Sequence, residues 1–108
     1  MVGRYRGTPD AAAVADPSTG VWVYDYPYWY VVGGTSVAAP VWAGIVNAAG
    51  GFSAASQNEL ATVYTNSGNA AEYDDVVQGS CGPNEGYLAG SGWDFCTGVG
   101  APRGYGGK

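Results

Sequence analysis

A serine in a glycine-rich turn is the residue of this sequence best suited to chemistry. Ser36 follows the pair Gly33-Gly34. A stretch of small and apolar residues then continues to Ala49. Paired glycines permit a sharp turn and let a substrate approach the backbone. At a helix N-terminus, free amides and the helix dipole favour the negative charge of an oxyanion. Ser36 is therefore a candidate nucleophile, although serine also serves commonly as a simple helix cap.

The residues before Ser36 predict two strands. Residues 21–26 and 29–32 are β-branched or aromatic, and Pro27 separates the two runs. The second run ends at the glycine pair, so it delivers the chain to the candidate nucleophile. We interpret the aromatic side chains of these strands as part of the core of a sheet.

The residues after the glycine pair predict two helices. The first runs from Ser36 to about Ala49, with Pro40 in its first turn and glycines at its end. It is apolar nearly all round, so we expect it to be buried. A second helix begins at Ser56, where Ser56 and Glu59 have the spacing of a capping box. The rest of the chain is rich in Gly, Asn and Asp, which predicts loops.

The composition excludes several classes of function. The chain has 108 residues, a length that suffices for one small domain. Of these residues 46% are hydrophobic and 12% are charged. Its formal net charge is −5, and its basic residues are Arg4, Arg6, Arg103 and Lys108. Nucleic acid is therefore not an expected partner, because phosphate neutralisation needs clustered basic side chains. No apolar run is long enough to cross a membrane. The absence of His excludes a Cys/His zinc site.

The two cysteines, Cys81 and Cys96, predict a disulfide. A cysteine pair in a chain rich in aromatic residues and poor in Lys is typical of exported proteins, whereas a structural metal site normally needs four ligands. Two free buried thiols are the alternative. The first residues of the chain lack the apolar segment of a signal peptide.

Several segments resemble one family of peptidases. Gly34-Thr35-Ser36-Val37-Ala38-Ala39-Pro40 is similar to the Gly-Thr-Ser-x-x-x-Pro signature that subtilisins and sedolisins share. Subtilisins need a His as general base, and this sequence has none. Further segments resemble the sedolisins, or serine-carboxyl peptidases, in the same order along the chain: residues 6–10, 15–20, 73–76, 90–94 and 97–102. The resemblance covers almost the whole chain and favours the sedolisins.

The resemblance implies a catalytic role for Ser36. In sedolisins the serine is activated by a Glu with help from an Asp, and a carboxylate base suits an acidic medium. These partners lie well before the serine in that family, so we expect them upstream of this chain. No carboxylate here matches them. We interpret Glu59 as a helix cap, and Glu72 and Glu85 as solvated loop residues.

The resemblance also implies a fold and a division of the chain. The fold class is α/β, the C-terminal part of a subtilisin-like parallel-sheet domain with a loop-rich calcium-binding end. Residues 1–35 form the loop and strands that lead to the nucleophile, residues 36–50 the nucleophile helix, and residues 73–102 the calcium-binding loop region. A parallel sheet that lacks most of its strands leaves unpaired edges and apolar faces, so we expect weak independent stability or association.

A calcium site near the C-terminus is part of what the resemblance implies. Carried over from sedolisins, its ligands are Asp75, Val76, Gly90, Gly92 and Asp94, with Val76 and the glycines acting through their carbonyls. Calcium takes six or more oxygens from carboxylates and backbone carbonyls. Asp74 is an alternative to Asp75, and a glycine-rich turn with two solvated Asp is the alternative to a metal site. The Cys81–Cys96 pair brackets this loop and would stabilise it by roughly 3 kcal/mol.

The predicted function is that of an extracellular serine-type endopeptidase active in acid, with tripeptidyl peptidase as the alternative within the family. Its expected partners are a protein or peptide substrate and the missing N-terminal part of the peptidase domain. Two other interpretations remain. In one of them the chain is an inactive truncated fragment. In the other it is a small secreted, calcium-stabilised binding module whose Tyr and Trp contact carbohydrate or protein.

Overall fold

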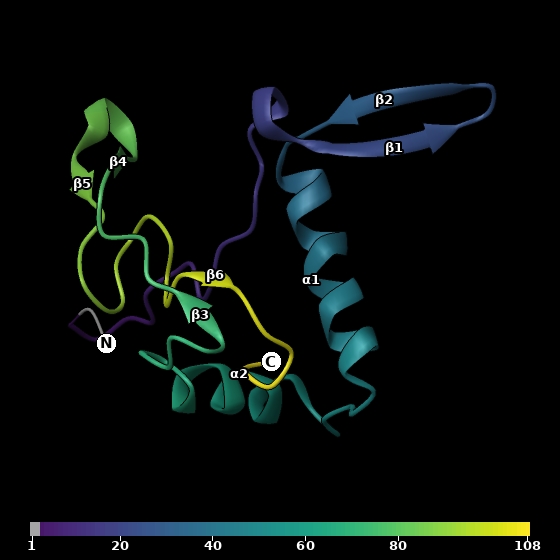
Figure 1. Cartoon of the computed structure of the whole chain (residues 1–108). Helices are drawn as coiled ribbons and strands as arrows, with labels where there is room; N and C mark the ends of the chain where they lie inside the picture. The colour runs from purple at the N-terminus through teal and green to yellow at the C-terminus, as the bar shows by residue number, and fades with distance from the viewer. Residues whose placement is uncertain (1–2) are drawn as a thin grey trace.

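The structure is a computed structural model that describes residues 3–108. Two helices and six short strands follow one another along the chain (Figure 1): β1 (Val21–Asp25), β2 (Tyr28–Val32), α1 (Thr35–Ala49), α2 (Ser56–Thr65), β3 (Tyr73–Asp74), β4 (Ser80–Cys81), β5 (Tyr87–Leu88) and β6 (Ala101–Pro102). Short 3-10 turns occur at Pro17–Thr19 and Pro83–Glu85. The fold is mixed α/β, as predicted. All the strand pairs among the described residues are antiparallel, and the expected parallel sheet is not seen in this part of the chain.

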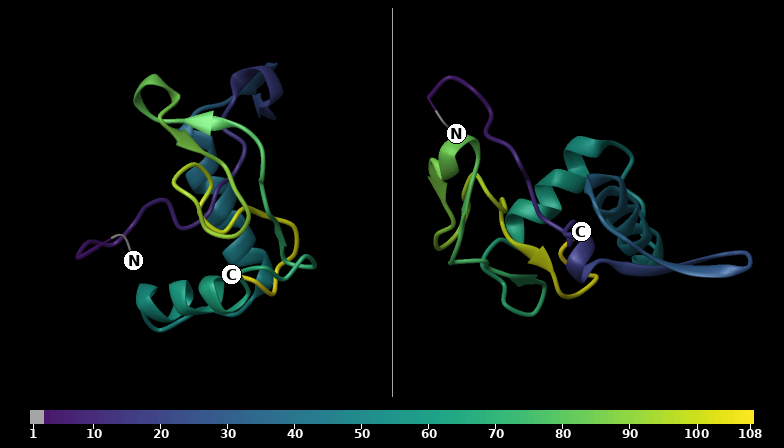
Figure 2. Two further views of the ribbon diagram at one scale, coloured as in Figure 1. Left: turned by 90° about the vertical axis from the view of Figure 1, so that its left-hand side faces the viewer. Right: turned by 90° about the horizontal axis from the view of Figure 1, so that it is seen from above.

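The two strands predicted before Ser36 form an antiparallel hairpin. Val21 of β1 lies opposite Val32 of β2, and Asp25 lies opposite Tyr28 next to the turn. The hairpin extends away from the other elements in Figure 1 and in the right-hand view of Figure 2. Because it pairs with no third strand among residues 3–108, both of its outer edges are unpaired there.

The aromatic side chains of the hairpin are exposed. Trp22 is 68% exposed and Trp29 63%, and Tyr26 at the turn is 85% exposed. Tyr24 and Trp29 lie side by side across the strands, with ring centroids 5.2 Å apart. The prediction that these residues form a sheet core is wrong for residues 3–108, because no second layer of structure within that range covers either face of the hairpin.

Helix α1 starts one residue earlier than predicted and ends as predicted at Ala49. Gly50 ends the helix with a left-handed φ of 73°. Pro40 is the sixth residue of the helix rather than part of its first turn. None of the residues of α1 is buried, so the prediction of a buried helix is wrong. Trp42 is half-buried and makes the main contact of the helix with the core.

Helix α2 begins at Ser56, as predicted, but without the capping box. Its N-cap is Ala55, and no side chain caps the first turn. Glu59 instead lies with Oε1 4.0 Å from the Lys108 Nζ. Val63 is the buried residue of α2 and faces the core.

The core is small and lies between α2, β3 and the last glycine-rich segment. Val63, Tyr73 and Val99 are buried, with exposed fractions of 5% or less, and Ala11 and Trp93 pack against them. The accessible surface of 7297 Å² exceeds the ~5,600 Å² expected of a compact monomer of this length. The excess follows from the projecting hairpin and from the exposed sides of α1.

Two strand pairs fix the C-terminal loops. β3 pairs with β6, which places the residues after Asp74 next to the end of the glycine-rich segment. β4 pairs with β5, and the predicted disulfide joins Cys81 to Cys96. No helix in the described part of the chain has the length and apolar character needed to cross a membrane.

Candidate functional site

Ser36 lies at the start of α1, directly after a tight junction with the N-terminal segment. The Gly34 N–H donates to the Ala15 carbonyl at 2.5 Å. A Cβ on Gly33 would lie 2.5 Å from the Pro17 Cα and 2.9 Å from the Ala15 oxygen, so a side chain there would push the two segments apart. The N-terminal segment therefore packs against Gly33, and a substrate cannot approach the backbone there. The prediction that a substrate could approach both glycines is wrong for Gly33.

Gly34 supplies the turn and leaves its outer side open. Its φ is 92°, in the region that favours glycine. A Cβ at Gly34 would meet nothing closer than the Ser36 nitrogen at 3.8 Å. The Gly34 carbonyl accepts the amides of Val37 at 2.9 Å and Ala38 at 3.2 Å. The amides of Thr35 and Ser36 come before these and have no acceptor within the helix, so they are available to an anion.

Ser36 is exposed and is the second residue of helix α1. The residue in the N-cap position is Gly34, and no side chain caps this helix. The alternative that Ser36 serves merely as the helix cap is therefore wrong. Pro40 lacks an N–H, so it cannot donate the hydrogen bond that the Ser36 carbonyl would otherwise accept from the next turn.

None of the three glutamates of the chain contacts Ser36, and two of them have partners elsewhere. Glu59 faces Lys108, and Glu72 accepts amide hydrogen bonds from the C-terminal segment. The prediction of Glu72 as a solvated loop residue is thus wrong. Glu85 is exposed in a 3-10 turn, as predicted. Among residues 3–108 no hydrogen bond or ion pair engages the Ser36 hydroxyl.

Asp94 is the most thoroughly hydrogen-bonded carboxylate of the chain. Its Oδ1 accepts the amides of Cys96 at 2.7 Å and Thr97 at 2.8 Å, and its Oδ2 accepts the Gly90 amide at 3.0 Å. The side chain is buried, with 8% of its surface exposed. Burial raises the pKa of the Asp94 carboxyl, but the three amide hydrogen bonds outweigh it and leave the pKa below its usual value. Asp94 is therefore held as a carboxylate.

Asp75 reaches the same loop from β3. Its Oδ2 accepts the Gly92 amide at 2.9 Å. Its Oδ1 is buried and has no hydrogen-bond partner among the described residues. Asp74 is exposed and pairs through its backbone with Ala101. Of the two adjacent aspartates, Asp75 is the one whose side chain contacts the loop.

Two contacts join four of the predicted calcium ligands in pairs, Asp75 with Gly92 and Asp94 with Gly90. Asp75 and Asp94 both bind loop 90–94 through its amides, and Val76 follows Asp75 in the half-buried backbone. Among residues 3–108 no group of three or more His, Cys, Asp or Glu side chains forms a metal cluster. Two carboxylates, one with a buried free oxygen, together with backbone carbonyls form a donor set suited to a hard cation such as calcium.

The amides of Cys96 and Thr97 are contacts that the sequence reasoning missed. They belong to a turn in which Asp94 accepts hydrogen bonds from the residues two and three positions later. An Asp at the start of a glycine-rich loop is a known signal for such a turn. The sequence therefore contained the signal for a turn, but the alternative of a glycine-rich turn placed Asp94 in solvent, whereas its side chain is buried.

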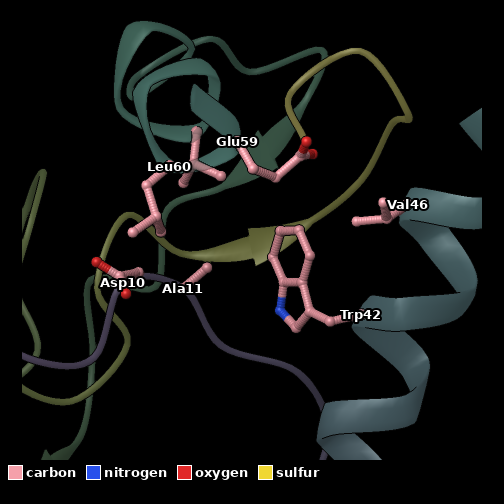
Figure 3. Close-up of a pocket in the computed structure, with 7 residues that line it drawn as sticks. Asp10, Ala11, Trp42, Val46, Glu59 and Leu60 are labelled. Carbon is pink, nitrogen blue, oxygen red and sulfur yellow. The ribbon is translucent and has the colours of Figure 1, made fainter. Parts of the chain in front are cut away.

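A cavity of about 240 Å³ lies between α1, α2 and the N-terminal segment. Figure 3 shows Trp42 of α1 and Leu60 of α2 facing each other across it, while the Glu59 carboxylate turns toward the C-terminal loop. Its lining is mainly apolar. The Ser36 turn lies at the opposite end of α1 from α2 (Figure 1).

Comparison with known proteins identifies the family. The chain is 37% identical over 108 residues to kumamolisin from Bacillus sp. (strain MN-32), which covers 94% of this chain and 19% of kumamolisin. It is 34% identical to sedolisin from Pseudomonas sp. (strain 101), over 89% of this chain and 17% of that protein. The chain belongs to the sedolisin family. It matches the C-terminal part of these relatives.

A third relative of this sedolisin-family chain is the tripeptidyl-peptidase sed1 of Aspergillus fumigatus, 34% identical over 91% of the chain and 15% of the relative. The chain thus spans less than a fifth of the length of the relatives that it matches. No family model matches it, and neither does a solved structure. The family predicted from the Ser36 segment and the later segments is confirmed.

Proposed function

We propose that this chain supplies the nucleophile and a calcium loop to an extracellular serine-carboxyl peptidase that cleaves proteins or peptides in acid. The observation that carries the proposal is the position of Ser36 in a sedolisin-family sequence. Ser36 is exposed and lies two residues after Gly34, whose outer side is open. The amides of Thr35 and Ser36 lie in the first turn of the helix and have no acceptor within it. Such amides suit the oxyanion that forms when a serine attacks a carbonyl. The Cys81–Cys96 disulfide supports an extracellular location.

In this proposal the general base comes from outside the chain. A serine hydroxyl is a weak nucleophile until an adjacent base accepts its proton. The sequence has no His; Glu59 and Glu72 have partners elsewhere, and Glu85 is exposed in a distant 3-10 turn. The Glu and Asp partners of a serine-carboxyl peptidase therefore belong to the upstream part of the domain, and the isolated chain is expected to be inactive.

The upstream part of the domain is also the proposed cover for the exposed apolar surfaces. The hairpin β1–β2 has two unpaired edges, and α1 has no buried residue. Strand edges and apolar faces of this kind are normally paired or covered in a complete domain. We infer that the subtilisin-like parallel sheet is formed largely by residues outside this chain.

A chimera tests the catalytic proposal. Residues 1–108 replace the matched C-terminal segment of kumamolisin, and peptide cleavage is measured at acidic pH. We expect cleavage by the chimera and a loss of at least about 10⁴-fold with Ser36→Ala, since nucleophile removal has effects of this size. Ser53→Ala is the matched control and should retain activity, because Ser53 is exposed between the two helices.

Two outcomes would contradict the catalytic proposal. One is a folded chimera in which Ser36→Ala cleaves as fast as the parent. The other is Ser36-dependent cleavage by the isolated chain, which would show that the base lies within residues 1–108.

The exposed aromatic side chains of the hairpin favour a second candidate, the binding module. A folded chimera that cleaves nothing would favour that second candidate or an inactive fragment.

For the loop we propose a calcium ion bound by Asp75, Asp94 and the carbonyls of Val76, Gly90 and Gly92. The buried free Oδ1 of Asp75 supports this proposal, because a buried polar atom without a partner is costly and a cation would satisfy it. Bound calcium would supply a fixed positive charge that joins β3 to the loop. The amides of Gly90, Cys96 and Thr97 hold Asp94 in the loop.

Thermal melting tests the calcium proposal. Calcium at 100 times its dissociation constant should stabilise the folded chain by about 2.7 kcal/mol relative to chelator, because it binds only the folded state. Asp75→Asn should abolish this shift. Asp74→Asn is the matched control and should retain it, because the Asp74 side chain is exposed. A folded wild-type chain whose melting temperature is the same in calcium and in chelator would contradict the site.

A further inference from the structure

The C-terminal segment, residues 104–108, folds back onto Glu72 and Tyr73. The Glu72 Oε2 accepts the amides of Gly106 at 2.7 Å and Gly107 at 3.0 Å. The Tyr73 hydroxyl donates to the Gly107 carbonyl at 2.5 Å. Hydrogen bonds to an ionised carboxylate are shorter and stronger than neutral ones. Both the amides of Gly106 and Gly107 and the carbonyl of Gly107 are therefore hydrogen-bonded to this pair of residues.

Sterics show how closely this segment fits. A Cβ on Gly106 would lie 2.7 Å from the Glu72 Oε1, and a Cβ on Gly107 would lie 2.6 Å from the Tyr73 Cε2. Real Cβ atoms do not approach other atoms so closely without a shift of the neighbours. A side chain at Gly106 would therefore displace the Glu72 carboxylate, and one at Gly107 would displace the Tyr73 ring.

Lys108 fastens the end of the segment to the helices. Its Nζ donates to the Gly51 carbonyl, between α1 and α2, and lies 4.0 Å from the Glu59 Oε1. The Lys108 side chain is 13% exposed. The segment therefore connects the region between the helices to the residues immediately before the calcium loop.

Tyr73 links this contact to the core. It is 3% exposed, and its ring stacks on that of Trp42 with centroids 6.4 Å apart. The buried Tyr73 hydroxyl is thus the donor to the Gly107 carbonyl.

The same stretch of backbone leads directly to Asp75. The Glu72 carbonyl accepts the Arg103 amide at 2.7 Å, and β3 pairs with β6 immediately afterwards. Asp75 follows β3 and holds the Gly92 amide at 2.9 Å. Glu72 and Tyr73 are therefore joined to Asp75 by the continuous backbone of β3.

We propose that Glu72 and Tyr73 are positioning residues: by holding the C-terminal segment they fix β3 and keep the Asp75 carboxylate on loop 90–94. The purpose of this arrangement rests on the calcium site proposed above, but the coupling exists without the ion. By linkage, calcium binding at Asp75 and docking of the segment stabilise each other. Release of the segment weakens the site from a distance.

Amide hydrogen exchange in the full chain, with chelator present, tests the coupling. The amides of Gly106 and Gly107 report the segment, the Gly92 amide reports Asp75, and the Val99 amide, which donates to the Asp10 carbonyl at 2.8 Å, reports the core. Glu72→Gln should accelerate exchange at Gly106, Gly107 and Gly92 by about fivefold or more, with Val99 unchanged.

Gly106→Ala perturbs the same contact from the other side and should give the same pattern, because its Cβ would push the Glu72 carboxylate away from the two amides. Two controls match these changes. Glu85→Gln removes the same charge at an exposed position, and Gly44→Ala adds a methyl group where no atom lies within 4 Å. Both controls should leave exchange at Gly92 unchanged.

Two results would overturn the coupling. One is faster exchange at Gly106 and Gly107 with the Gly92 rate unchanged, which would make the contact a local anchor. The other is an equal increase at Val99 in both variants, which would assign the effect to general destabilisation of the fold.

A calcium titration by calorimetry separates this proposal from the calcium site itself. With calcium bound by the wild type, Glu72→Gln should weaken the affinity by about fivefold, and an unchanged affinity would contradict the linkage. If the wild type binds no calcium while Gly92 still responds to Glu72→Gln, the coupling stands and the calcium site fails.

Discussion

At the residue scale, the carboxylates of this chain differ in what holds them. Asp94 is surrounded by amides, Glu72 binds the C-terminal segment, and Asp10 accepts hydrogen bonds from the Arg6 guanidinium and, at 2.7 Å, from the Tyr64 hydroxyl. The Arg6 hydrogen bond is the main reason why the pKa of Asp10 lies below its ordinary value. Partial burial opposes it, and Tyr64 adds to the lowering.

The lowered pKa of Asp10 predicts a dependence of stability on acid. Because the pKa is lower in the folded chain, Asp10 contributes stability above its unfolded pKa of about 3.9. That contribution is lost as the pH falls through the lowered folded value. Asp10→Asn should reduce the unfolding free energy at pH 6 and flatten its decline toward pH 3. Urea unfolding at a series of pH values measures this, and a parallel decline in the variant and wild type would contradict it.

At the element scale, short pairs of strands and one covalent link hold the loops. β4 and β5 form a pair of two residues each, which is too short to be stable alone. The disulfide joins two cysteines that are 15 residues apart in the sequence. The covalent loop that it closes contains residues 90–94. The hairpin β1–β2 has no comparable support and depends on its own cross-strand contacts.

The disulfide prediction belongs to this scale. The double variant Cys81→Ser, Cys96→Ser should lower the unfolding free energy by about 3 kcal/mol, because the unfolded chain gains the freedom of the closed loop. Chemical unfolding monitored by tryptophan fluorescence gives the value. A change below about 0.5 kcal/mol would show that the loop is held by its hydrogen bonds alone.

At the scale of the whole molecule, the exposed surface dominates. The radius of gyration is 14.9 Å, against ~13 Å for a compact domain of this length. The projecting hairpin presents Trp22, Tyr24, Trp29 and Val31 on one face, each of them 42% exposed or more. A large exposed apolar surface of this kind normally contacts another surface.

We therefore expect the isolated chain to associate. Sedimentation velocity should show an average mass that rises with concentration, and Trp22→Thr with Trp29→Thr should reduce this association because Thr keeps strand propensity without the large apolar ring. Tyr5→Thr is a matched control, because Tyr5 is 80% exposed outside the hairpin. A strictly monomeric wild type at high concentration would contradict the expectation.

The sequence alone determined the local features of this protein. Glycine pairs, β-branched runs and small-residue stretches act over a few residues, and they correctly predicted both helices, both hairpin strands and the Ser36 turn. The signature around Ser36 and the segments after it also gave the family. The Cys81–Cys96 pair was predicted from composition and is present.

The tertiary structure decided how these elements are used, because burial and hydrogen bonding depend on segments far apart in the chain. Glu59 faces Lys108 rather than capping its helix, and Glu72 binds amides 34 and 35 residues away. The hairpin and α1 look like core elements in sequence, yet they are exposed because nothing within residues 3–108 covers them. Hydrophobic spacing shows that a face needs a partner, whereas only the packed structure shows whether the partner is present.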